Sequence, residues 1–395
     1  MMGQGEAFAA RRVMLAGAGN IGSFAAGFVA RMSGVTRLTL VDPDRYSPEN
    51  VVGQDITRQE VGLLKVEAQV RRLRRINPAL DVEAIPEAVG DIALGRLRAD
   101  VMLGCVDGRA ARQHLNEIAW RLGVPWIDAG VLPSQGLVRV SVFVPGRGRP
   151  CLECGWHDAD YAALEQVYAC REGRPPSSAP SSRGTAPLGA LAASLQGMVL
   201  GRMQAGEAAA LAGRQVVFDG TTCTAVTTRL PCNPDCRFPD HEPWTIRPLP
   251  ARAETWPLAR LFQAGEEDGL GPAHAVSLSV HGSRFATQAR CVTCGTVRPV
   301  LCLERAWRTS VRACGRCGGE RFVTGFDLTD RLRASALVPR QLSRSLQNLG
   351  ILPGDVLTLT GDGGTCHFEV GFDAGAGRSA AGLAGDDAAA PAAEG

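Results

Sequence analysis

Three observations predict an α/β fold, in which a doubly wound, mostly parallel, Rossmann-like sheet precedes a small zinc-ribbon and C-terminal β-containing module. First, short apolar runs such as RVMLAG and RLTLVD alternate with helical stretches between Arg12 and Gly136. Second, a glycine-rich turn separates the first run from the helical stretch that follows it. Third, two C-x2-C pairs stand close together late in the chain, with the spacing of a four-thiolate metal site.

Length and charge limit the classes of function. The chain has 395 residues, enough for two or three domains of roughly 100 to 200 residues each. Its formal net charge is only +2, so no broad cationic surface indicates nucleic acid or an anionic membrane as a partner. No apolar run approaches the roughly 18 residues of a spanning helix, and residues 1–12 lack a signal-peptide pattern. We expect a soluble, cytoplasmic protein without nucleic-acid or membrane partners.

Changes in composition predict the domain boundaries. Residues 157–187 are expected to form an irregular crossover loop, because Pro, Ser, Gly and Arg dominate REGRPPSSAPSSRGTAP. A Pro-rich stretch follows the first domain, and the last residues are rich in Gly and Ala. We expect an α/β domain at 1–244, a linker at 245–285, a zinc ribbon at 286–325, a small α/β module at 326–373 and a disordered tail at 374–395.

A candidate nucleotide site begins at the glycine-rich turn. Gly17, Gly19 and Gly22 follow a predicted strand and open a helix, where backbone amides and the helix amino terminus can approach phosphate oxygens. Asp42 ends the next strand, where its carboxylate can bond ribose hydroxyls. By themselves, these residues would also fit a nicotinamide or flavin Rossmann domain.

A series of short motifs follows Asp42 in a recognisable order. DPD at 42–44 precedes SPEN at 47–50, Gln54, Lys65, INP at 76–78 and CVD at 105–107, and later come PCLECGW, SLQ and a VVFDG strand leading to NPDC. In this order the motifs resemble the adenylation domain of the ThiF/MoeB/HesA family, the prokaryotic relatives of ubiquitin-activating enzymes. The resemblance covers roughly residues 12–236.

The resemblance implies nucleotide-binding roles for the matched residues, which are Gly17, Gly19, Gly22, Asp42, Asp44, Asn50, Gln54, Lys65 and Asp107. Within this set, Asp42 would hold the ribose, and Asn50 and Lys65 would meet the phosphates of ATP. Asp107 would carry Mg²⁺. It follows the run VMLGC, so it lies at the carboxyl end of a strand, where ligands of doubly wound sheets gather. Capping of the next helix is its alternative role.

Lys65 is the only lysine, whereas the other 41 of the 42 basic residues are Arg. A single Lys in an Arg-rich chain indicates a need for a compact, mobile ammonium, as in a phosphate contact. The alternative is a lysine that stands by chance on a solvated helix face.

Two features depart from the family pattern. Gly53 stands where the family usually has Arg, and no Arg-bearing N-terminal helix is recognisable. Arg58 could replace the first arginine, and Arg11 or Arg12 the second.

Cysteine spacing predicts two structural zinc sites. The members of the predicted ribbon are Cys291, Cys294, Cys314 and Cys317, whose four thiolates would close a tetrahedron. Cys151 and Cys154 supply half of another site, for which the family takes the second half from a Cys pair after NPxC. Here Cys236 fits the first position, and either Cys232 or His241 could be the fourth ligand. Free buried thiols are the alternative for this group.

Cys170 is the candidate nucleophile. It lies between the CLECGW motif and the Pro/Ser-rich loop, where activating enzymes of the family place a thioester-forming cysteine. Arg171 and Arg174 would favour the reactive thiolate. A cysteine that packs at a helix end is the alternative.

By resemblance, the chain is an ATP- and Mg²⁺-dependent enzyme that adenylates the C-terminal glycine carboxylate of a ubiquitin-like protein. Capture on Cys170 as a thioester and transfer to a conjugating enzyme would follow. Adenylation of a sulfur-carrier protein without a thioester is the alternative. A catalytically reduced scaffold, suggested by Gly53, and an NAD-dependent oxidoreductase are further hypotheses. By resemblance to the family we also expect a homodimer.

Overall fold

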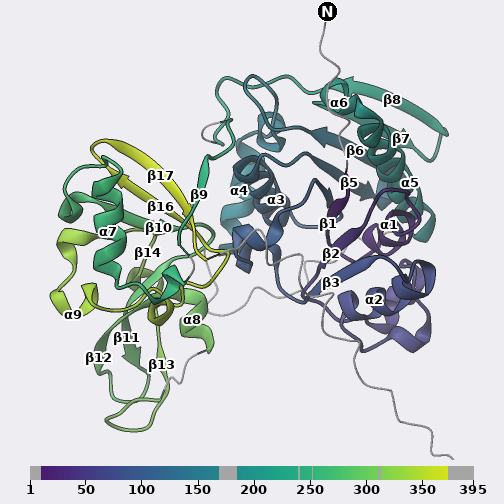
Figure 1. Cartoon of the computed structure of the whole chain (residues 1–395). Coiled ribbons are helices and arrows are strands. Elements are labelled where there is room, and N and C mark those ends of the chain that lie inside the picture. The colour runs from purple at the N-terminus through teal and green to yellow at the C-terminus, as the bar shows by residue number, and fades with distance from the viewer. Residues whose placement is uncertain (1–9, 169–184, 239–240, 251, 310–312, 372–395) are drawn as a thin grey trace, which may run out of the picture. The chain divides into compact units, whose positions relative to one another are not determined.

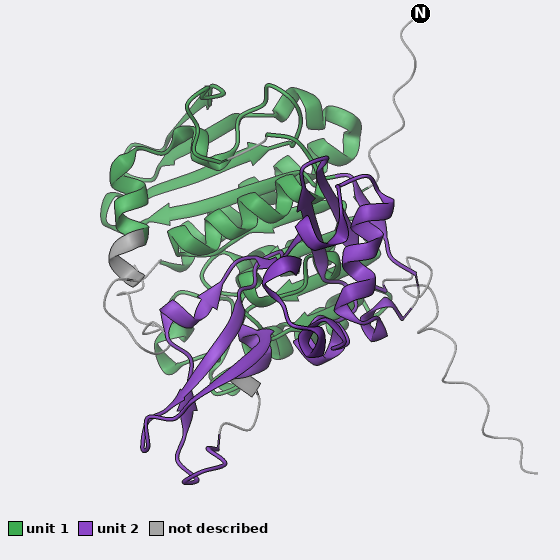
Figure 2. Cartoon of the chain, turned by 90° about the vertical axis from the view of Figure 1, so that its left-hand side faces the viewer, with its two compact units in different colours: residues 1–244 green, residues 245–395 purple. Residues whose placement is uncertain are grey.

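The computed structural model divides the chain into two compact units, residues 1–244 and 245–395 (Figure 2). It describes residues 10–168, 185–238, 241–250, 252–309 and 313–371. Each unit has its own hydrophobic core, so each is described by itself. Within the described residues, every helix is too short or too polar to span a bilayer.

The first unit is built on one eight-stranded sheet with the order β3-β2-β1-β4-β5-β6-β7-β8 (Figure 1). Neighbouring strands are parallel from β3 through β5, and β6, β7 and β8 continue the sheet in antiparallel pairs. The strands are β1 (Arg12–Ala16), β2 (Arg37–Val41), β3 (Asp81–Ile85), β4 (Val101–Gly104), β5 (Trp126–Leu132), β6 (Leu137–Phe143), β7 (Arg214–Asp219) and β8 (Thr224–Arg229). The chain order reverses between β1 and β4, where a doubly wound sheet opens its ligand crevice. The predicted Rossmann-like sheet is confirmed.

Helices cover both faces of this sheet. They are α1 (Gly22–Val29), α2 (Lys65–Ile76), α3 (Arg109–Leu122), α4 (Asp158–Tyr168), α5 (Ala186–Arg202) and α6 (Ala208–Leu211). Alternate strand residues, among them Leu15, Leu40 and Leu103, pack in one core with α1, α2 and α5. The intervening Met102 and Trp126 are also fully buried, and α3 contacts their strands, β4 and β5. Burial on both faces explains why these parallel strands are continuous apolar runs.

The predicted crossover loop is partly wrong. Residues Asp158–Tyr168 form α4, and α5 begins at Ala186, so both ends of the segment 157–187 are helical. Two acidic residues, Asp158 and Asp160, stand in the first turn of α4, where they favour a helix start. The Pro- and Ser-rich composition begins only after this helix. Residues 169–184, which include Cys170, lie outside the described residues.

The second unit contains two sheets. A five-stranded sheet has the order β15-β10-β16-β17-β9, and a smaller sheet joins β11 to β12, β13 and β14. The strands are β9 (Ile246–Pro248), β10 (Ser277–Val280), β11 (Phe285–Cys291), β12 (Val297–Leu303), β13 (Arg321–Phe322), β14 (Leu328–Thr329), β15 (Leu332–Arg333), β16 (Val356–Gly361) and β17 (Gly364–Glu369). The helices are α7 (Leu258–Glu267), α8 (Glu304–Thr309) and α9 (Pro339–Leu342).

The predicted linker at 245–285 is wrong. These residues supply β9, α7 and β10, and Leu258, Leu261 and Phe262 of α7 are buried in the same core as Leu357 and Leu359 of β16. The Pro-rich composition concealed an amphipathic helix with apolar residues at i, i+3 and i+4. The expected boundary between ribbon and module at 325/326 is also wrong, because β14 pairs with β11.

Candidate nucleotide site and metal centres

The glycine-rich turn between β1 and α1 brings the backbone against the segment that follows β4. Gly17 has a φ of +90°, and a Cβ there would lie 2.6 Å from the carbonyl oxygen of Cys105. A Cβ at Gly22 would lie 1.7 Å from the Gly17 carbonyl oxygen. A Cβ at Gly19, by contrast, would meet no described atom within 4 Å. The first and third glycines therefore close the turn, and the second leaves open space beside it.

Asp42, directly after β2, anchors this turn. Its Oδ2 accepts a hydrogen bond of 2.7 Å from the Ala18 amide, and its Oδ1 accepts one of 2.9 Å from the Asp44 amide. Burial raises the pKa of the Asp42 carboxyl, and the ammonium of Lys65, 3.8 Å away, opposes this shift. The structure thus places Asp42 at the predicted edge and shows it holding backbone amides. Asp44 is the more exposed carboxylate beside it, with 47% of its side chain accessible.

Lys65, the first residue of α2, is the cation at this edge of the sheet. Its Nζ lies 2.9 Å from Asp44 Oδ2 and 3.8 Å from Asp42 Oδ1. Its side chain is only 11% exposed. The alternative of a chance lysine on a solvated helix face is therefore wrong, because Lys65 is buried against two carboxylates.

Tyr46 and Gln69 also hold the glycine turn, and the sequence analysis missed both. The Tyr46 hydroxyl donates to the Ala18 carbonyl oxygen at 2.9 Å and accepts from Gln69 Nε2 at 2.8 Å. Both backbone groups of Ala18 are consequently bonded, the amide by Asp42 and the carbonyl by Tyr46. Gln69 lies one helical turn after Lys65, and this i, i+4 spacing is the signal that could have found it.

The segment after Asp44 carries the other predicted phosphate contacts. Asn50 Oδ1 accepts a hydrogen bond of 2.9 Å from the Ser47 amide. Gln54 Oε1 is buried and has no hydrogen-bond partner among the described residues, which makes it an acceptor that a ligand or water can satisfy. Arg58 is exposed. Arg12 begins β1, at the end of the strand opposite the glycine turn, and pairs there with Asp100. The replacement role expected of Arg11 or Arg12 stays a prediction.

Asp107 lies just beyond the carboxyl end of β4, next to the glycine turn. The Cys105 amide donates to the Ala16 carbonyl oxygen at 2.8 Å, which ties the two segments together. The N-cap of α3 is Gly108, so the alternative helix-capping role of Asp107 is wrong. The Asp107 carboxylate is exposed and makes no hydrogen bond or ion pair in the part of the chain that the structure describes. An exposed, unpaired carboxylate is a ligand that suits Mg²⁺.

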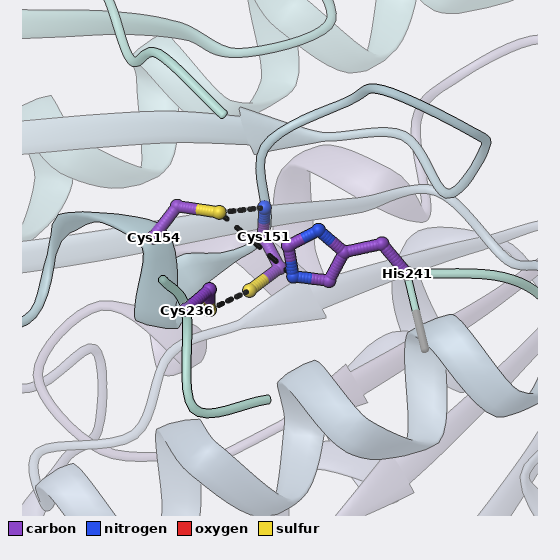
Figure 3. A group of neighbouring side chains, drawn as sticks. All are labelled: Cys151, Cys154, Cys236 and His241. Carbon is purple, nitrogen blue, oxygen red and sulfur yellow. Dashed lines mark hydrogen bonds between the residues drawn. The ribbon is translucent and has the colours of Figure 1, made fainter. Parts of the chain in front are cut away.

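The first cysteine group consists of Cys151, Cys154, Cys236 and His241, whose side chains point toward one another (Figure 3). Their ligand atoms all lie within 4.8 Å of one another. Cys151 Sγ is 3.7 Å from Cys236 Sγ, and Cys154 Sγ is 3.9 Å from His241 Nε2. Cys232 is not in this group; its Sγ lies 3.7 Å from Nδ1, the other ring nitrogen of His241. Three thiols and one imidazole suit a structural zinc tetrahedron, and the structure favours His241 as the fourth donor.

Helix α3 supports this first group. Asn116 Oδ1 accepts a hydrogen bond of 3.0 Å from the Leu152 amide, in the turn between the two cysteines of the C-x2-C pair. Trp120 is fully buried, and its ring centroid lies 5.1 Å from that of His241 and 6.2 Å from that of Phe238. The donors are thus packed against a helix of the main fold.

The second cysteine group consists of the four cysteines of the predicted ribbon. The Sγ atoms of Cys291 and Cys317 are 3.5 Å apart, and those of Cys294 and Cys314 are 3.7 Å apart. Cys291 ends β11, and the other donors come from the loops around β12 and β13. Four thiols are the donor set of a closed structural zinc site. A bound zinc ion, here and at the first group, stays a prediction.

The fold and these sites define a Rossmann-like α/β protein of the nucleotide-binding type that also carries cysteine groups suited to metal. The chain belongs to the ThiF family, which it matches over residues 2–238. The molybdopterin-synthase adenylyltransferase of Escherichia coli K12 is 31% identical over 234 residues, which are 58% of this chain and 88% of that protein.

Two further relatives carry different names. The sulfur carrier protein ThiS adenylyltransferase of Escherichia coli K12 is 31% identical over 150 residues, 37% of this chain and 59% of the relative. Ubiquitin-like modifier-activating enzyme 5 of Oryza sativa is 28% identical over 187 residues, 44% of each chain. The predicted family is confirmed, and adenylyl transfer is the activity for which several of its relatives are named.

Proposed function

We propose that the first unit binds ATP with Mg²⁺ and adenylates the C-terminal glycine carboxylate of a ubiquitin-like protein. One observation carries this proposal: the closed glycine turn, the buried cation Lys65 and the Asp107 carboxylate, which is unpaired among the described residues, all lie at one edge of the sheet. The family match over residues 2–238 and the names of the relatives support it.

The chemistry needs little acid or base help. The attacking glycine carboxylate is already ionised at pH 7, so the protein has to neutralise phosphate charge and keep water out. Lys65 would supply the cation, the amino terminus of α1 after the glycine turn would approach the phosphates, and Asp107 would hold Mg²⁺, which stabilises charge on phosphate oxygens. The carboxylate oxygen bonds to the α-phosphorus, and pyrophosphate leaves to give an acyl adenylate. Gln54 Oε1 remains available to a donor group of the nucleotide or of water.

Two routes differ in the step that follows adenylation. In the first, the Cys170 thiolate captures the acyl group as a thioester, AMP leaves, and the acyl group passes to the cysteine of a conjugating enzyme. In the second, a sulfide-level sulfur nucleophile attacks the acyl carbon of a sulfur-carrier adenylate, AMP leaves, and a thiocarboxylate forms. The relatives include proteins named for both kinds of substrate. We favour the thioester route because the chain adds a whole second unit after the part that matches the family. In this proposal the enzyme is a homodimer, and each chain holds two structural zinc ions.

Replacement of Asp107 tests the site. Asp107→Ala should lower the rate of ATP–pyrophosphate exchange by more than about 100-fold. Even the loss of an outer-shell partner of a metal lowers metal affinity or activity by about 10–100-fold. Exchange is measured with ubiquitin-fold proteins that end in Gly and are encoded by neighbouring genes. Asp362→Ala, at an exposed aspartate of the second unit, is the matched control and should exchange like the wild type. Full exchange by Asp107→Ala would show that the magnesium site lies elsewhere.

Intact mass under non-reducing conditions separates the two routes. The wild type, mixed with ATP, Mg²⁺ and the same Gly-terminated proteins, should gain a thiol-sensitive adduct that Cys170→Ala lacks. Cys223→Ala removes an exposed cysteine of the described residues and should keep the adduct. Pyrophosphate release without an adduct on the wild type would exclude the thioester route and leave the sulfur-carrier route.

Ligand preference tests the remaining hypotheses. A thermal shift should be larger with ATP than with NAD, because the site pairs a phosphate-binding turn with Lys65. A larger shift with NAD would instead support an oxidoreductase. ATP binding without pyrophosphate formation for any acceptor would support a scaffold that has lost its activity.

A further inference from the structure

A cluster of charges around one buried carboxylate lies beside Asp107 and has no role in the chemistry described above. Asp128 of β5 is fully buried and forms ion pairs with two arginines. One is Arg112 of α3, whose Nη1 donates to Asp128 Oδ1. The other is Arg139 of β6, whose Nη2 lies 2.8 Å from Asp128 Oδ2. A buried carboxylate is costly unless it is paired, so Asp128 holds the guanidinium of Arg112 firmly.

Arg112 forms hydrogen bonds on both sides of Asp107. Its side-chain Nη2 donates to the Val106 carbonyl oxygen at 2.7 Å, and its backbone amide donates to the Gly108 carbonyl oxygen at 3.1 Å. The Asp107 carboxylate has no contact of its own within the described ranges. Its direction therefore depends on the two neighbouring peptide groups. The Arg112 side chain holds the Val106 carbonyl, and the main chain of α3 holds the Gly108 carbonyl.

The preceding part of the segment is fixed by other residues. The Cys105 amide bonds to the Ala16 carbonyl oxygen at 2.8 Å, and Gln196 Nε2 donates to the Gly104 carbonyl oxygen at 3.1 Å. These bonds end at Cys105, and among the described residues only the Arg112 side chain extends the support beyond it, to the Val106 carbonyl oxygen. A planar guanidinium can give one NH2 to the carboxylate and the other to the carbonyl, whereas an ammonium lacks this fixed fork.

We infer that Arg112, held by Asp128, is a positioning residue that aims the Asp107 carboxylate at Mg²⁺. The inference rests on the proposed function, because it takes Asp107 as the magnesium ligand. Arg112 touches neither nucleotide nor metal in this role. Its loss should therefore weaken binding of the nucleotide only when Mg²⁺ is present.

Calorimetry with the non-hydrolysable analogue α,β-methylene-ATP tests this inference on the full chain. In Mg²⁺, Arg112→Lys should bind the analogue about 10–100-fold more weakly than the wild type, the usual effect of losing an outer-shell partner. In EDTA, its affinity should equal that of the wild type. Arg139→Lys is the matched control, because Arg139 pairs with the same buried carboxylate and forms no hydrogen bond to residues 106–108. It should match the wild type in both buffers.

A double variant adds a second readout. Asp107→Ala combined with Arg112→Lys should bind no more weakly in Mg²⁺ than Asp107→Ala alone, because both changes remove the same interaction. Additive losses would overturn the inference, and so would equal losses in Mg²⁺ and EDTA or no loss at all. If Arg112→Lys does not fold, Arg112→Gln, which leaves Asp128 paired with Arg139, decides by the same comparison. A wild type whose nucleotide affinity ignores Mg²⁺ would overturn the proposed role of Asp107 as well.

Discussion

The two cysteine groups differ in how the chain builds them. The first joins Cys151 to Cys236, 85 residues apart, and packs with Trp120 of α3 in a small apolar cluster that also contains Phe238. The second joins Cys291 to Cys317, 26 residues apart, through short loops at one end of a small sheet. A group that is packed on the main fold is supported by that fold. A group assembled from local loops must itself support the loops.

The largest expected effect is at the second group. Cys314→Ser should lose one of two zinc equivalents and the amide protection of residues 291–297 and 313–322, because small zinc modules unfold without their metal. Zinc analysis and hydrogen exchange with mass spectrometry measure both. Cys366→Ser, at a half-buried cysteine in β17, should keep both zinc equivalents. Persistent protection after metal loss would show that the loops do not need the metal.

A core substitution probes the support of the first group. Trp120→Ala should lower the free energy of unfolding of the first unit by about 3–5 kcal/mol, because it empties a fully buried aromatic site beside His241 and Phe238. Urea unfolding followed by far-ultraviolet circular dichroism measures this change. The second group should keep its zinc. An unchanged stability would contradict the view that α3 supports the first group.

The fourth donor of the first group gives a smaller, more selective effect. His241→Ala should weaken zinc binding at this group by more than about tenfold, because a direct ligand contributes at least as much as an outer-shell partner. Competition with a chromophoric chelator measures the affinity. Cys232→Ser is the control and should bind zinc like the wild type, since Cys232 faces the other ring nitrogen of His241. The reverse result would make Cys232 the ligand.

The smallest expected difference between the groups is in the pH at which they release zinc. A hydrogen bond with the Thr296 hydroxyl lowers the pKa of Cys294 to about 6, and a hydrogen bond with Cys151 lowers the pKa of Cys154 to about 5. A lowered thiol pKa favours the thiolate, whose stabilising contribution is lost as the pH falls through that pKa. On acidification, the second group should therefore release zinc at a higher pH than the first, as a zinc-sensitive dye would report.

Removal of the Thr296 hydroxyl tests this difference in the pH of zinc release. Thr296→Val removes the hydrogen bond to Cys294, which has a length of 3.1 Å, and should move zinc release from the second group to a still higher pH. The first group should not change. Release from the first group before the second would contradict the assignment of the two thiolates.

Local motifs made much of the nucleotide site predictable. Gly17, Asp42 and Lys65 each follow or begin an element whose type is visible in the sequence, and the carboxyl ends of parallel strands meet at one edge. Arg112 and Asp128 were not predictable, because a helix residue and a strand residue 16 positions apart share no periodic pattern. Spacing could not decide between Cys232 and His241 either, since both stand within reach of Cys236.

The second unit shows where composition misleads. Its Pro-rich beginning indicated a linker, yet the apolar positions of α7 already had helical spacing. One partner of β10 is β16, which begins at Val356, far along the chain. Such distant antiparallel pairing leaves no local signal in the sequence. The ribbon and the module were therefore predicted as separate parts, whereas their apolar residues share one core.

The burial of Lys65 has a consequence for covalent modification of the protein. Neutral, accessible amines attack acyl adenylates and amine-reactive dyes. Lys65 carries the only ε-amine of the 395 residues, and that amine is ion-paired and 11% exposed. In the native state, the chain would thus offer almost no accessible lysine side chain for self-acylation, and an isopeptide link to its one lysine would require this region to open.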